Sequence, residues 1–397
     1  MRASKRAPIT LGGATFPHLI GRALAIAIGT RFALAIIAWM SLRIFPRFSS
    51  YPAQLPDSFL SQHPFLDGWA RWDTSHYVAV AQLGYGNPAS PSPQGGLGFF
   101  PLYPLLMRAL VAITGVEKTA GAFAVAGIVI SNICFLVAIA LLVVITTEVA
   151  GERVALHTVL LFCVAPFSFF FNAAYSESLF LVLVLLSLWF ARRGQWWAAG
   201  MCAALGSATR LVGLAIGPAL LFMAWRRGAK PKDLLVIALL SPSGLVAFFT
   251  YCALKFDDLF AYFNAQSEWG GWTEHVRFYA ELFIKDPKTA IGGDPRHLII
   301  ILNVGLLVLF LALLPMVWKR LDEGTAMLTT LLIVVQGAAT WVSLGRYLMP
   351  AIGVLIVGGI LLTHPKIAGW PRDTIVVSSA MLLSLLTVLF AHGFWVV

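Results

Sequence analysis

The sequence contains few charged residues for its length. Of its 397 residues only 12% are Asp, Glu, Lys or Arg, whereas an ordinary soluble domain has about 25%. Hydrophobic residues make up 59% of the chain, and the mean hydropathy is +0.83. This composition excludes a soluble enzyme, a disordered protein and a fibrous repeat, and it leaves a membrane protein as the remaining class.

Cysteines and clustered metal ligands are equally scarce. The four cysteines lie in apolar runs without CxxC or Cys/His spacing, so we expect small buried side chains instead of disulfides or metal ligands. No DxD or HxxxH motif occurs, and we predict neither a metal nor another cofactor. The alternative is a divalent ion held by one carboxylate and a substrate phosphate. The absence of an internal repeat disfavours a transporter built from two related halves.

Apolar runs of about 20 residues, the length of helix that crosses a bilayer, recur along the chain. They are continuous and not alternating, which indicates helices. We predict an all-α polytopic integral membrane protein, a single domain over 1–397 with about 11 transmembrane helices. The first span lacks the cleavage pattern of a signal peptide and is retained. The predicted spans are 23–43, 119–147, 154–172, 178–191, 196–209, 211–225, 233–254, 297–318, 325–342, 347–363 and 374–395.

The net charge of +10 would suggest nucleic acid as the partner of a soluble protein. Here the positive-inside rule explains it better, and we expect membrane lipids and no nucleic acid as partners. With a cytoplasmic N-terminus, every short basic linker falls on one side, from Arg2, Lys5 and Arg6 to Arg372. We therefore predict a multi-pass protein of a prokaryotic plasma membrane.

Two long segments, 44–118 and 255–296, separate consecutive predicted spans, and both fall on the outer, non-cytoplasmic face. Long loops in a compact fold are usually functional or disordered. These segments are rich in aromatic and charged residues, which favours ordered structure at the membrane interface. The stretch 99–115 is apolar but contains two prolines and Arg108, so we predict an interfacial helix instead of a span.

The most informative segment is 67–85, in the first outer loop. From Asp73 onward it predicts a short helix, because Asp73, Tyr77 and Val80 share one face. Asp73 would begin that helix, where backbone N–H groups favour a carboxylate. A plain N-cap is one interpretation. The other is a general base for a lipid-borne or sugar hydroxyl, because Asp73 lies among aromatic residues beside Arg71 and His76.

Short motifs of charged, aromatic and glycine residues are spread over residues 65–350. They are Arg71-Trp72-Asp73-Thr74-Ser75-His76-Tyr77, Gly84-Tyr85, Phe99-Phe100-Pro101-Leu102-Tyr103-Pro104, Tyr175-Ser176-Glu177-Ser178, Thr209-Arg210-Leu211-Val212-Gly213, Ala265-Gln266 and Ser343-Leu344-Gly345-Arg346-Tyr347-Leu348-Met349-Pro350. In this order and spacing they resemble the PIG-V family of mannosyltransferases. The compact chain, without long soluble insertions, is similar to prokaryotic members.

The resemblance implies a GT-C glycosyltransferase fold with interfacial helices and a catalytic acidic residue in the first outer loop. It also implies a polyprenyl- or dolichyl-phosphate mannose donor and a lipid-linked or glycan acceptor on the non-cytoplasmic face. Asp73 is then the base of an inverting transfer that forms an α-mannoside. The alternatives are a GT-C enzyme that uses another polyprenyl-phosphate sugar, and a carrier or flippase for a lipid-linked saccharide.

Cations near this face are candidates for binding the donor phosphate. Arg346 offers a planar fork that matches phosphate oxygens, and an interfacial snorkelling Arg is its alternative. Arg210 either contacts the phosphate or pairs with Glu177. Arg31, inside the first span, faces the bundle interior and either pairs with an acid or approaches the phosphate. His76 either contacts the phosphate or is an ordinary interfacial His.

A third set of residues is predicted to contact the sugar or the acceptor. For Gln266 and Trp269 loop packing is the alternative, and Glu177 could instead simply favour the N-terminus of the helix that follows it. The set comprises Asp67, Arg71, Trp72, Tyr77, Glu177, Gln266 and Trp269.

Overall fold

The computed structural model describes residues 15–46, 59–90, 93–268, 274–288 and 295–396, and every regular element in these ranges is a helix. Arg2, Lys5, Arg6 and Trp269 lie outside the described residues. The predicted all-α class is confirmed. The longest helices are α1 (Thr15–Ile44), α5 (Ala120–Ala150), α15 (Pro295–Arg320) and α19 (Trp370–Ala391).

The other helices include short ones that connect or flank the spans. They are α2 (Pro64–Asp67), α3 (Asp73–Leu83), η1 (Pro93–Gly96), α4 (Leu102–Thr114), α6 (Glu152–Val164), η2 (Ser168–Phe171), α7 (Glu177–Arg192), α8 (Trp196–Ser207), η3 (Leu211–Ala215), α9 (Ile216–Arg226), α10 (Pro231–Leu240), α11 (Ser243–Phe256), α12 (Ala261–Ser267), α13 (Glu274–Lys285), α16 (Glu323–Ala339), α17 (Leu344–Leu348) and α18 (Ile352–Thr363).

Five helical stretches among the described residues are long and apolar enough to cross a membrane: 17–44, 120–150, 231–256, 297–320 and 370–391, of which 231–256 comprises α10 and α11. Each of the eleven predicted spans overlaps a helix, but several of these helices are shorter than predicted. The predicted span 154–172 ends as a helix at Val164, because the chain turns at Pro166 into η2. The span 233–254 is divided into α10 and α11 around Pro242, whose ring disfavours a continuous helix.

Local sequence explains where the long helices begin and end. Thr119 caps α5, since its side chain accepts a hydrogen bond from the N–H of Ala122 at 3.2 Å, and Gly151 follows the helix with a φ of 91°. The α8–η3 reversal depends on two glycines in close contact. A Cβ at Gly213 would lie 2.3 Å from the carbonyl carbon of Gly206. This tight reversal places Arg210 at the end of the bundle.

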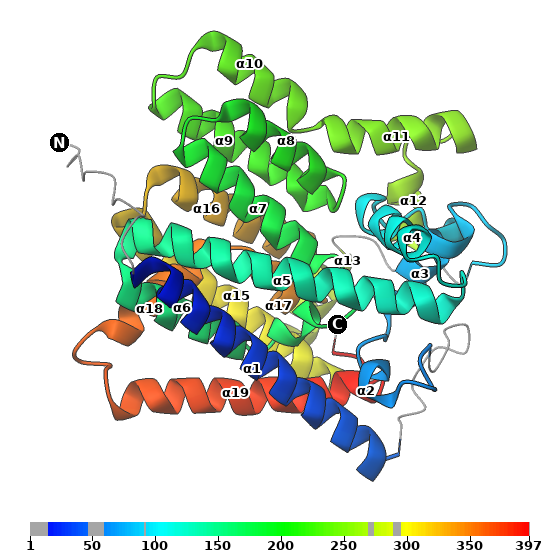
Figure 1. Cartoon of the computed structure of the whole chain (residues 1–397), viewed down its shortest axis with the longest axis horizontal. Helices are drawn as coiled ribbons and strands as arrows, with labels where there is room; N and C mark the ends of the chain where they lie inside the picture. The colour runs from blue at the N-terminus through cyan, green and yellow to red at the C-terminus, as the bar shows by residue number, and fades with distance from the viewer. Residues whose placement is uncertain (1–14, 47–58, 91–92, 269–273, 289–294, 397) are drawn as a thin grey trace.

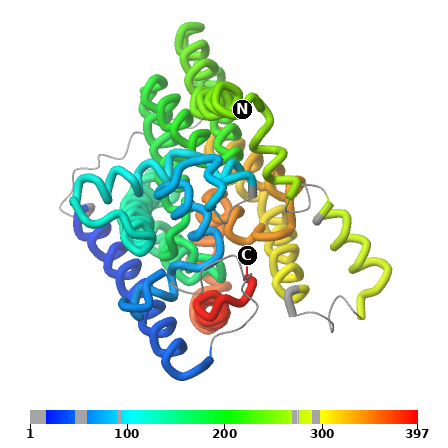
Figure 2. The backbone as a smooth tube through the Cα atoms, turned by 90° about the vertical axis from the view of Figure 1, so that its right-hand side faces the viewer, coloured from blue at the N-terminus to red at the C-terminus, as the bar shows by residue number. Residues whose placement is uncertain are grey.

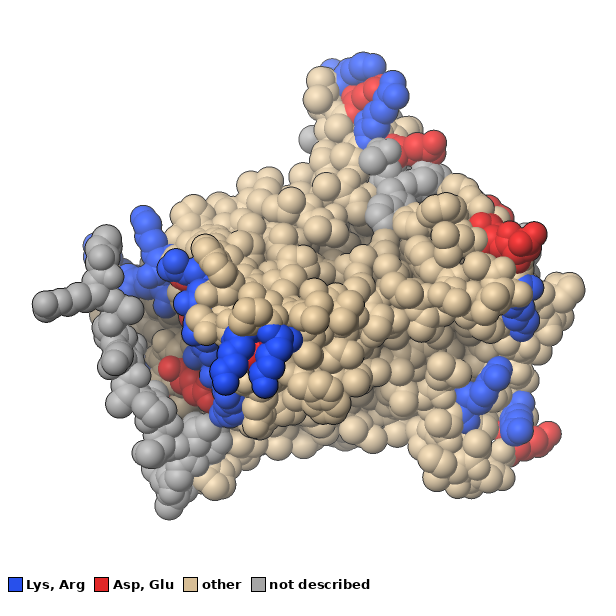
Figure 3. Space-filling model, turned by 90° about the horizontal axis from the view of Figure 1, so that it is seen from above, with Lys and Arg blue, Asp and Glu red and all other residues tan. Residues whose placement is uncertain are grey.

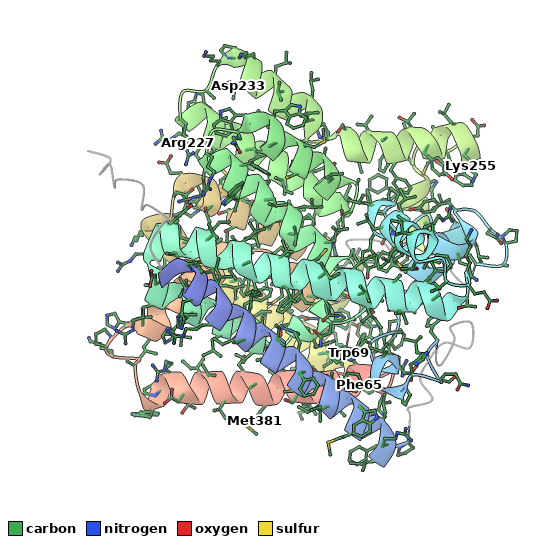
Figure 4. All side chains as sticks on the ribbon, viewed as in Figure 1. Phe65, Trp69, Arg227, Asp233, Lys255 and Met381 are labelled. Carbon is green, nitrogen blue, oxygen red and sulfur yellow. The ribbon has the colours of Figure 1, made fainter. Side chains whose placement is uncertain are left out.

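The long helices run across Figure 1, and the charged residues gather at their two ends. Figure 3 shows uncharged surface between a charged left end and a charged right end, and a further group of charged residues on a projection at the upper edge. A wide uncharged surface between charged ends is typical of a protein that spans a bilayer. Figure 4 places Arg227 and Asp233 at one end and Lys255 at the other. We call these the basic end and the site end.

The first outer loop covers the site end. In Figure 1, α4 is seen nearly along its axis while α5 crosses the page, so α4 lies across the end of the bundle. Figure 2, which views this end, shows the loop and the C-terminal end of α19 in front of the helix ends, with α13 standing away from them. The loop therefore brings α3 to the ends of the longer helices.

Candidate functional site

Asp73 is the first residue of α3, as the sequence predicts. Its carboxylate does not cap the helix: Trp72 occupies the N-cap position without a side-chain cap bond. Instead, Asp73 Oδ2 lies 2.7 Å from Nη2 of Arg346, and the Asp73 side chain is 24% exposed. The plain N-cap interpretation is wrong, and Asp73 belongs to an ion pair that solvent reaches.

The turn before Asp73 has an unusual backbone. Trp72 has φ 51° and ψ −114°, a conformation that residues other than glycine rarely adopt. Such a residue typically costs about 1–3 kcal/mol and persists only where surrounding contacts hold it. Tyr175 provides two of these contacts. Its hydroxyl accepts a hydrogen bond from the N–H of Asp73 at 3.1 Å and donates one to the carbonyl of Arg71 at 3.2 Å.

Arg346 lies on the short helix α17, and its side chain is only 5% exposed. A Cβ at the preceding Gly345 would come within 2.2 Å of the Phe167 ring, so only glycine fits there. Burial lowers the pKa of Arg346, but Asp73, Tyr347 and Glu177 outweigh burial and hold that pKa well above its ordinary value. The guanidinium is therefore a fixed positive charge at neutral pH.

Glu177 links Arg346 to a second arginine. Its Oε1 accepts a hydrogen bond from Arg210 Nη1 at 2.6 Å and lies 3.5 Å from Arg346 Nε, in ion-pair range but outside hydrogen-bond geometry. The Glu177 side chain is 2% exposed. The predicted Arg210–Glu177 pair is present. Four charges from α3, α17, α7 and the α8–η3 reversal thus alternate in sign, from Asp73 to Arg210.

Aromatic rings surround both guanidinium groups. Arg346 lies 5.2 Å from the ring centre of Phe170, 5.1 Å from Tyr175 and 4.8 Å from Tyr347. Arg210 lies 4.5 Å from the ring of Tyr347. Rings at these distances attract a cation and exclude water. Sequence reasoning did not assign Tyr175, Tyr347 or Phe170 to the site, although Tyr347 follows Arg346 and Tyr175 lies two residues before Glu177.

The site retains hydrogen-bonding capacity. Arg346 Nε and Nη1 and Glu177 Oε2 are buried and form no hydrogen bond with the described residues. Buried polar atoms without partners are rare in native proteins, and each such atom needs an explanation. Two free N–H directions on a buried guanidinium suit an anionic group such as a phosphate. No group of three His, Cys, Asp or Glu that could hold a metal ion occurs in the part of the chain that the structure describes.

His76 and Tyr77 lie beneath Asp73 on α3. His76 stacks on Phe99 with ring centres 4.8 Å apart and is 8% exposed. Burial lowers the pKa of His76 more than Asp73 raises it, so its imidazole is neutral at pH 7 and provides no fixed cation for a phosphate. The Tyr77 hydroxyl lies 2.8 Å from Ser176 Oγ. Both rings therefore support the helix that begins with Asp73.

Arg31 is buried in the bundle, as predicted, but its partners differ from those expected. It donates to the Ser168 carbonyl at 2.6 Å and to Ser168 Oγ at 3.1 Å, and it lies 4.2 Å from the centre of the Phe135 ring. No acid pairs with it among the described residues. Arg31 thus stabilises the break between α6 and η2, and we no longer assign it to the phosphate.

Asp67 and Arg71 pair with each other, with Arg71 Nη2 2.8 Å from Asp67 Oδ2 and both side chains 1% exposed. A sugar could not reach them without disrupting this pair, so we withdraw them as acceptor contacts. Gln266 Nε2 donates to the carbonyl of Gly98 at 3.0 Å, which ties α12 to the first outer loop. The loop-packing alternative fits Gln266.

The fold and the site define a class of protein. It is a helical membrane protein that holds a cluster of four charged side chains, lined by aromatic rings, at one end of its bundle. Comparisons with known proteins agree. The model of the family described as Mannosyltransferase (PIG-V) matches residues 36–227, which include Asp73, Glu177 and Arg210. Over residues 36–227 this match confirms the resemblance to the PIG-V family that the motifs indicate.

Among curated proteins, the GPI alpha-1,6-mannosyltransferase 2 of Mus musculus is 31% identical over 162 residues, which cover 38% of this chain and 30% of the mouse protein. The Homo sapiens protein is 28% identical over 182 residues, 42% of this chain and 34% of the human protein. The matches thus span about a third of these relatives' own length.

Solved structures also resemble the chain. ArnT from Cupriavidus metallidurans, bound to undecaprenyl phosphate, has a TM-score of 0.49 at 15% identity and covers 93% of this chain and 76% of its own. The apo Archaeoglobus fulgidus oligosaccharyltransferase has a TM-score of 0.49 at 14% identity and covers 93% and 56%.

Proposed function

We propose that this protein is a GT-C membrane mannosyltransferase, which transfers mannose from a polyprenyl- or dolichyl-phosphate donor to a hydroxyl of a lipid-linked or glycan acceptor. The main observation in support is the contact between Asp73 and Arg346, 2.7 Å apart at the end of the bundle. It brings a carboxylate that can accept a proton next to a buried cation with unused donors.

The transfer would proceed by inversion in one displacement. The acceptor hydroxyl gives its proton to the Asp73 carboxylate as its oxygen attacks the anomeric carbon of the donor. The bond between that carbon and the phosphate oxygen breaks, and its electron pair leaves on the polyprenyl phosphate. Arg346 stabilises the developing negative charge, because its guanidinium is already fixed in a water-poor, aromatic environment.

The remaining residues of the chain of charges maintain this arrangement. Glu177 keeps Arg346 and Arg210 close together although both are cations. Nε and Nη1 of Arg346 have no hydrogen-bond partner among the described residues, so a donor phosphate can bind there while Asp73 Oδ2 keeps its contact with Nη2. The other oxygen of the Asp73 carboxylate then accepts the proton of the acceptor hydroxyl. Trp269 stays a predicted contact of the sugar or the acceptor, whereas the side chains of Trp72 and Tyr77 bond to Phe394 and Ser176.

The family match supports the choice of mannose, and the relatives' name, GPI alpha-1,6-mannosyltransferase, supports an α-linked product. We place the N-terminus in the cytoplasm and the site on the non-cytoplasmic face of a prokaryotic plasma membrane. The separation of the basic linkers from the site end supports this orientation.

The direct test uses the purified chain in nanodiscs with synthetic polyprenyl-phosphate mannose and a panel of acceptors, among them octyl α-mannoside. The expected result is formation of an α-mannoside together with polyprenyl phosphate. Turnover of a glucose, arabinose or galactosamine donor in place of mannose would change the assigned sugar. In proteoliposomes, movement of the intact donor across the bilayer without cleavage would indicate a carrier and refute the proposal.

A further inference from the structure

The turn that presents Asp73 is anchored to the other end of the sequence. Arg71 Nε donates a hydrogen bond to the carbonyl of Ala391, the last residue of α19, at 2.9 Å. The indole Nε1 of Trp72 donates to the carbonyl of Phe394 at 3.3 Å. The two residues that precede Asp73 thus both contact a segment more than 300 positions away.

The Arg71 anchor is rigid because its guanidinium is held on both sides. Nη1 donates to the Asp67 carbonyl at 2.7 Å, and Nη2 pairs with the Asp67 carboxylate at 2.8 Å. Both side chains are buried, and a buried ion pair is costly to break by removing one partner. Arg71 therefore joins α2, the Asp73 turn and the end of α19 in one unit.

The Trp72 anchor acts where the backbone is strained. Trp72 has a φ of 51°, and Tyr175 fixes the peptide groups on both sides of it through the Asp73 N–H and the Arg71 carbonyl. The indole–Phe394 bond fixes the side chain of the strained residue itself. If these contacts were lost, the turn would relax toward an ordinary conformation and move the Asp73 carboxylate away from Arg346.

We propose that Arg71 and Trp72 are positioning residues, which hold Asp73 against Arg346 by anchoring its turn on Ala391–Phe394. The segment Ala391–Phe394 lies outside residues 36–227, so the family match assigns no role to it. The effect of this anchor on the rate of sugar transfer rests on the proposed function, whereas the anchoring of the turn does not.

The test is Trp72→Phe in the full-length protein in nanodiscs, since Phe keeps an aromatic ring but lacks the indole N–H that bonds to Phe394. Hydrogen exchange measured by mass spectrometry should become faster in peptides that cover 70–77. With polyprenyl-phosphate mannose and octyl α-mannoside, kcat should fall about tenfold and the donor KM stay within about twofold, because a slightly misplaced catalytic group slows the chemical step and not donor binding.

Arg71→Lys provides a second variant, because Lys keeps a charge for Asp67 but lacks the Nε that bonds to Ala391. It should show the same pattern of exchange and kcat. Trp197→Phe is the matched control: Trp197 is 64% exposed on α8, and this variant should keep wild-type exchange, kcat and KM.

The outcomes separate the two proposals. Unchanged exchange at 70–77 in both variants would refute the anchor, and faster exchange with unchanged kcat would refute a positioning role. A lower kcat with an equally raised donor KM would show a general loss of the site and also refute positioning. If the wild-type protein turns over no sugar donor, the proposed function fails, and the exchange measurement alone decides whether the anchor exists.

Discussion

The basic end and the site end each contain a network of ion pairs, but the networks differ in how fully they are bonded. At the basic end, Arg192 pairs with both Glu148 and Asp322, and Arg193 pairs with the second oxygen of Glu148. Asp322 also accepts from the N–H of Thr325 at 3.1 Å and so caps α16. All four carboxylate oxygens of Glu148 and Asp322 therefore have partners.

At the site end, the bonds are incomplete. Glu177 Oε2 and Arg346 Nη1 are buried and without hydrogen bonds among the described residues. A satisfied network rigidifies a structure, whereas unsatisfied buried groups are costly and are retained where a ligand uses them. The ion pairs of the basic end therefore hold α5, α7 and α16 together. The site end instead has unused donors that can bind an anion.

The largest effect is expected from Asp73→Asn, which removes the proposed base and keeps the size of the side chain. The transfer rate should fall about 10²–10⁴-fold, the range for loss of a general base. Radiolabelled mannose transfer measures this loss, with Asp233→Asn at the basic end as the control. Near-normal turnover by the Asp73 variant would show that the base is another group.

A smaller loss is expected from Arg346→Ala, because Arg346 is proposed to bind the donor phosphate. The value of kcat/KM for the donor should fall about 10²–10³-fold, as for loss of one group that stabilises a developing anion, while the acceptor KM changes little. Initial rates at varied donor concentration give the result, and Arg153→Ala, an exposed arginine, is the control. An unchanged donor dependence would remove Arg346 from the phosphate site.

Arg192→Met tests whether the ion pairs at the basic end are structural, since it removes the arginine that bonds to both Glu148 and Asp322. We expect about 2 kcal/mol of lost stability, typical of hydrogen bonds to charged groups, without a change in kcat per folded molecule. A thermal-shift assay and kinetics on the same sample separate the two effects. A selective fall in kcat would mean that the basic end also takes part in catalysis.

The smallest effect concerns His76, whose pKa burial lowers from its ordinary 6.5. Below about pH 6.5 the unfolded chain binds a proton at His76 that the folded chain does not, so stability should decrease as the pH falls. In His76→Phe, which keeps the stacking on Phe99, the melting temperature should depend less on pH between 7.5 and 5.5. His364→Phe, an exposed control, should keep the wild-type dependence. An identical dependence in all three proteins would contradict the neutral, buried assignment of His76.

Much of the fold follows from local sequence. Continuous apolar runs predict helices because every backbone group in lipid needs a partner within its own segment, and each predicted span overlaps a helix. The start of α3 at Asp73 was predictable from periodicity. The shortened α6 and the division at Pro242 were missed, although Pro166 and Pro242 both lie inside the predicted spans.

The candidate site also has a part that the sequence predicts and a part that it does not. The residue types and motifs were sufficient to nominate Asp73, Glu177, Arg210 and Arg346, because ionisable groups near a membrane are costly and have few structural uses. Partner choice was not predictable, since it depends on which helix ends meet. Arg31 bonds to the Ser168 carbonyl, Arg71 to the Ala391 carbonyl, and Arg346 to a carboxylate 273 positions earlier in the chain. Similar guanidinium groups thus acquire different tasks, because hydropathy acts locally along a helix whereas an ion pair forms only where folding brings opposite charges within about 4 Å.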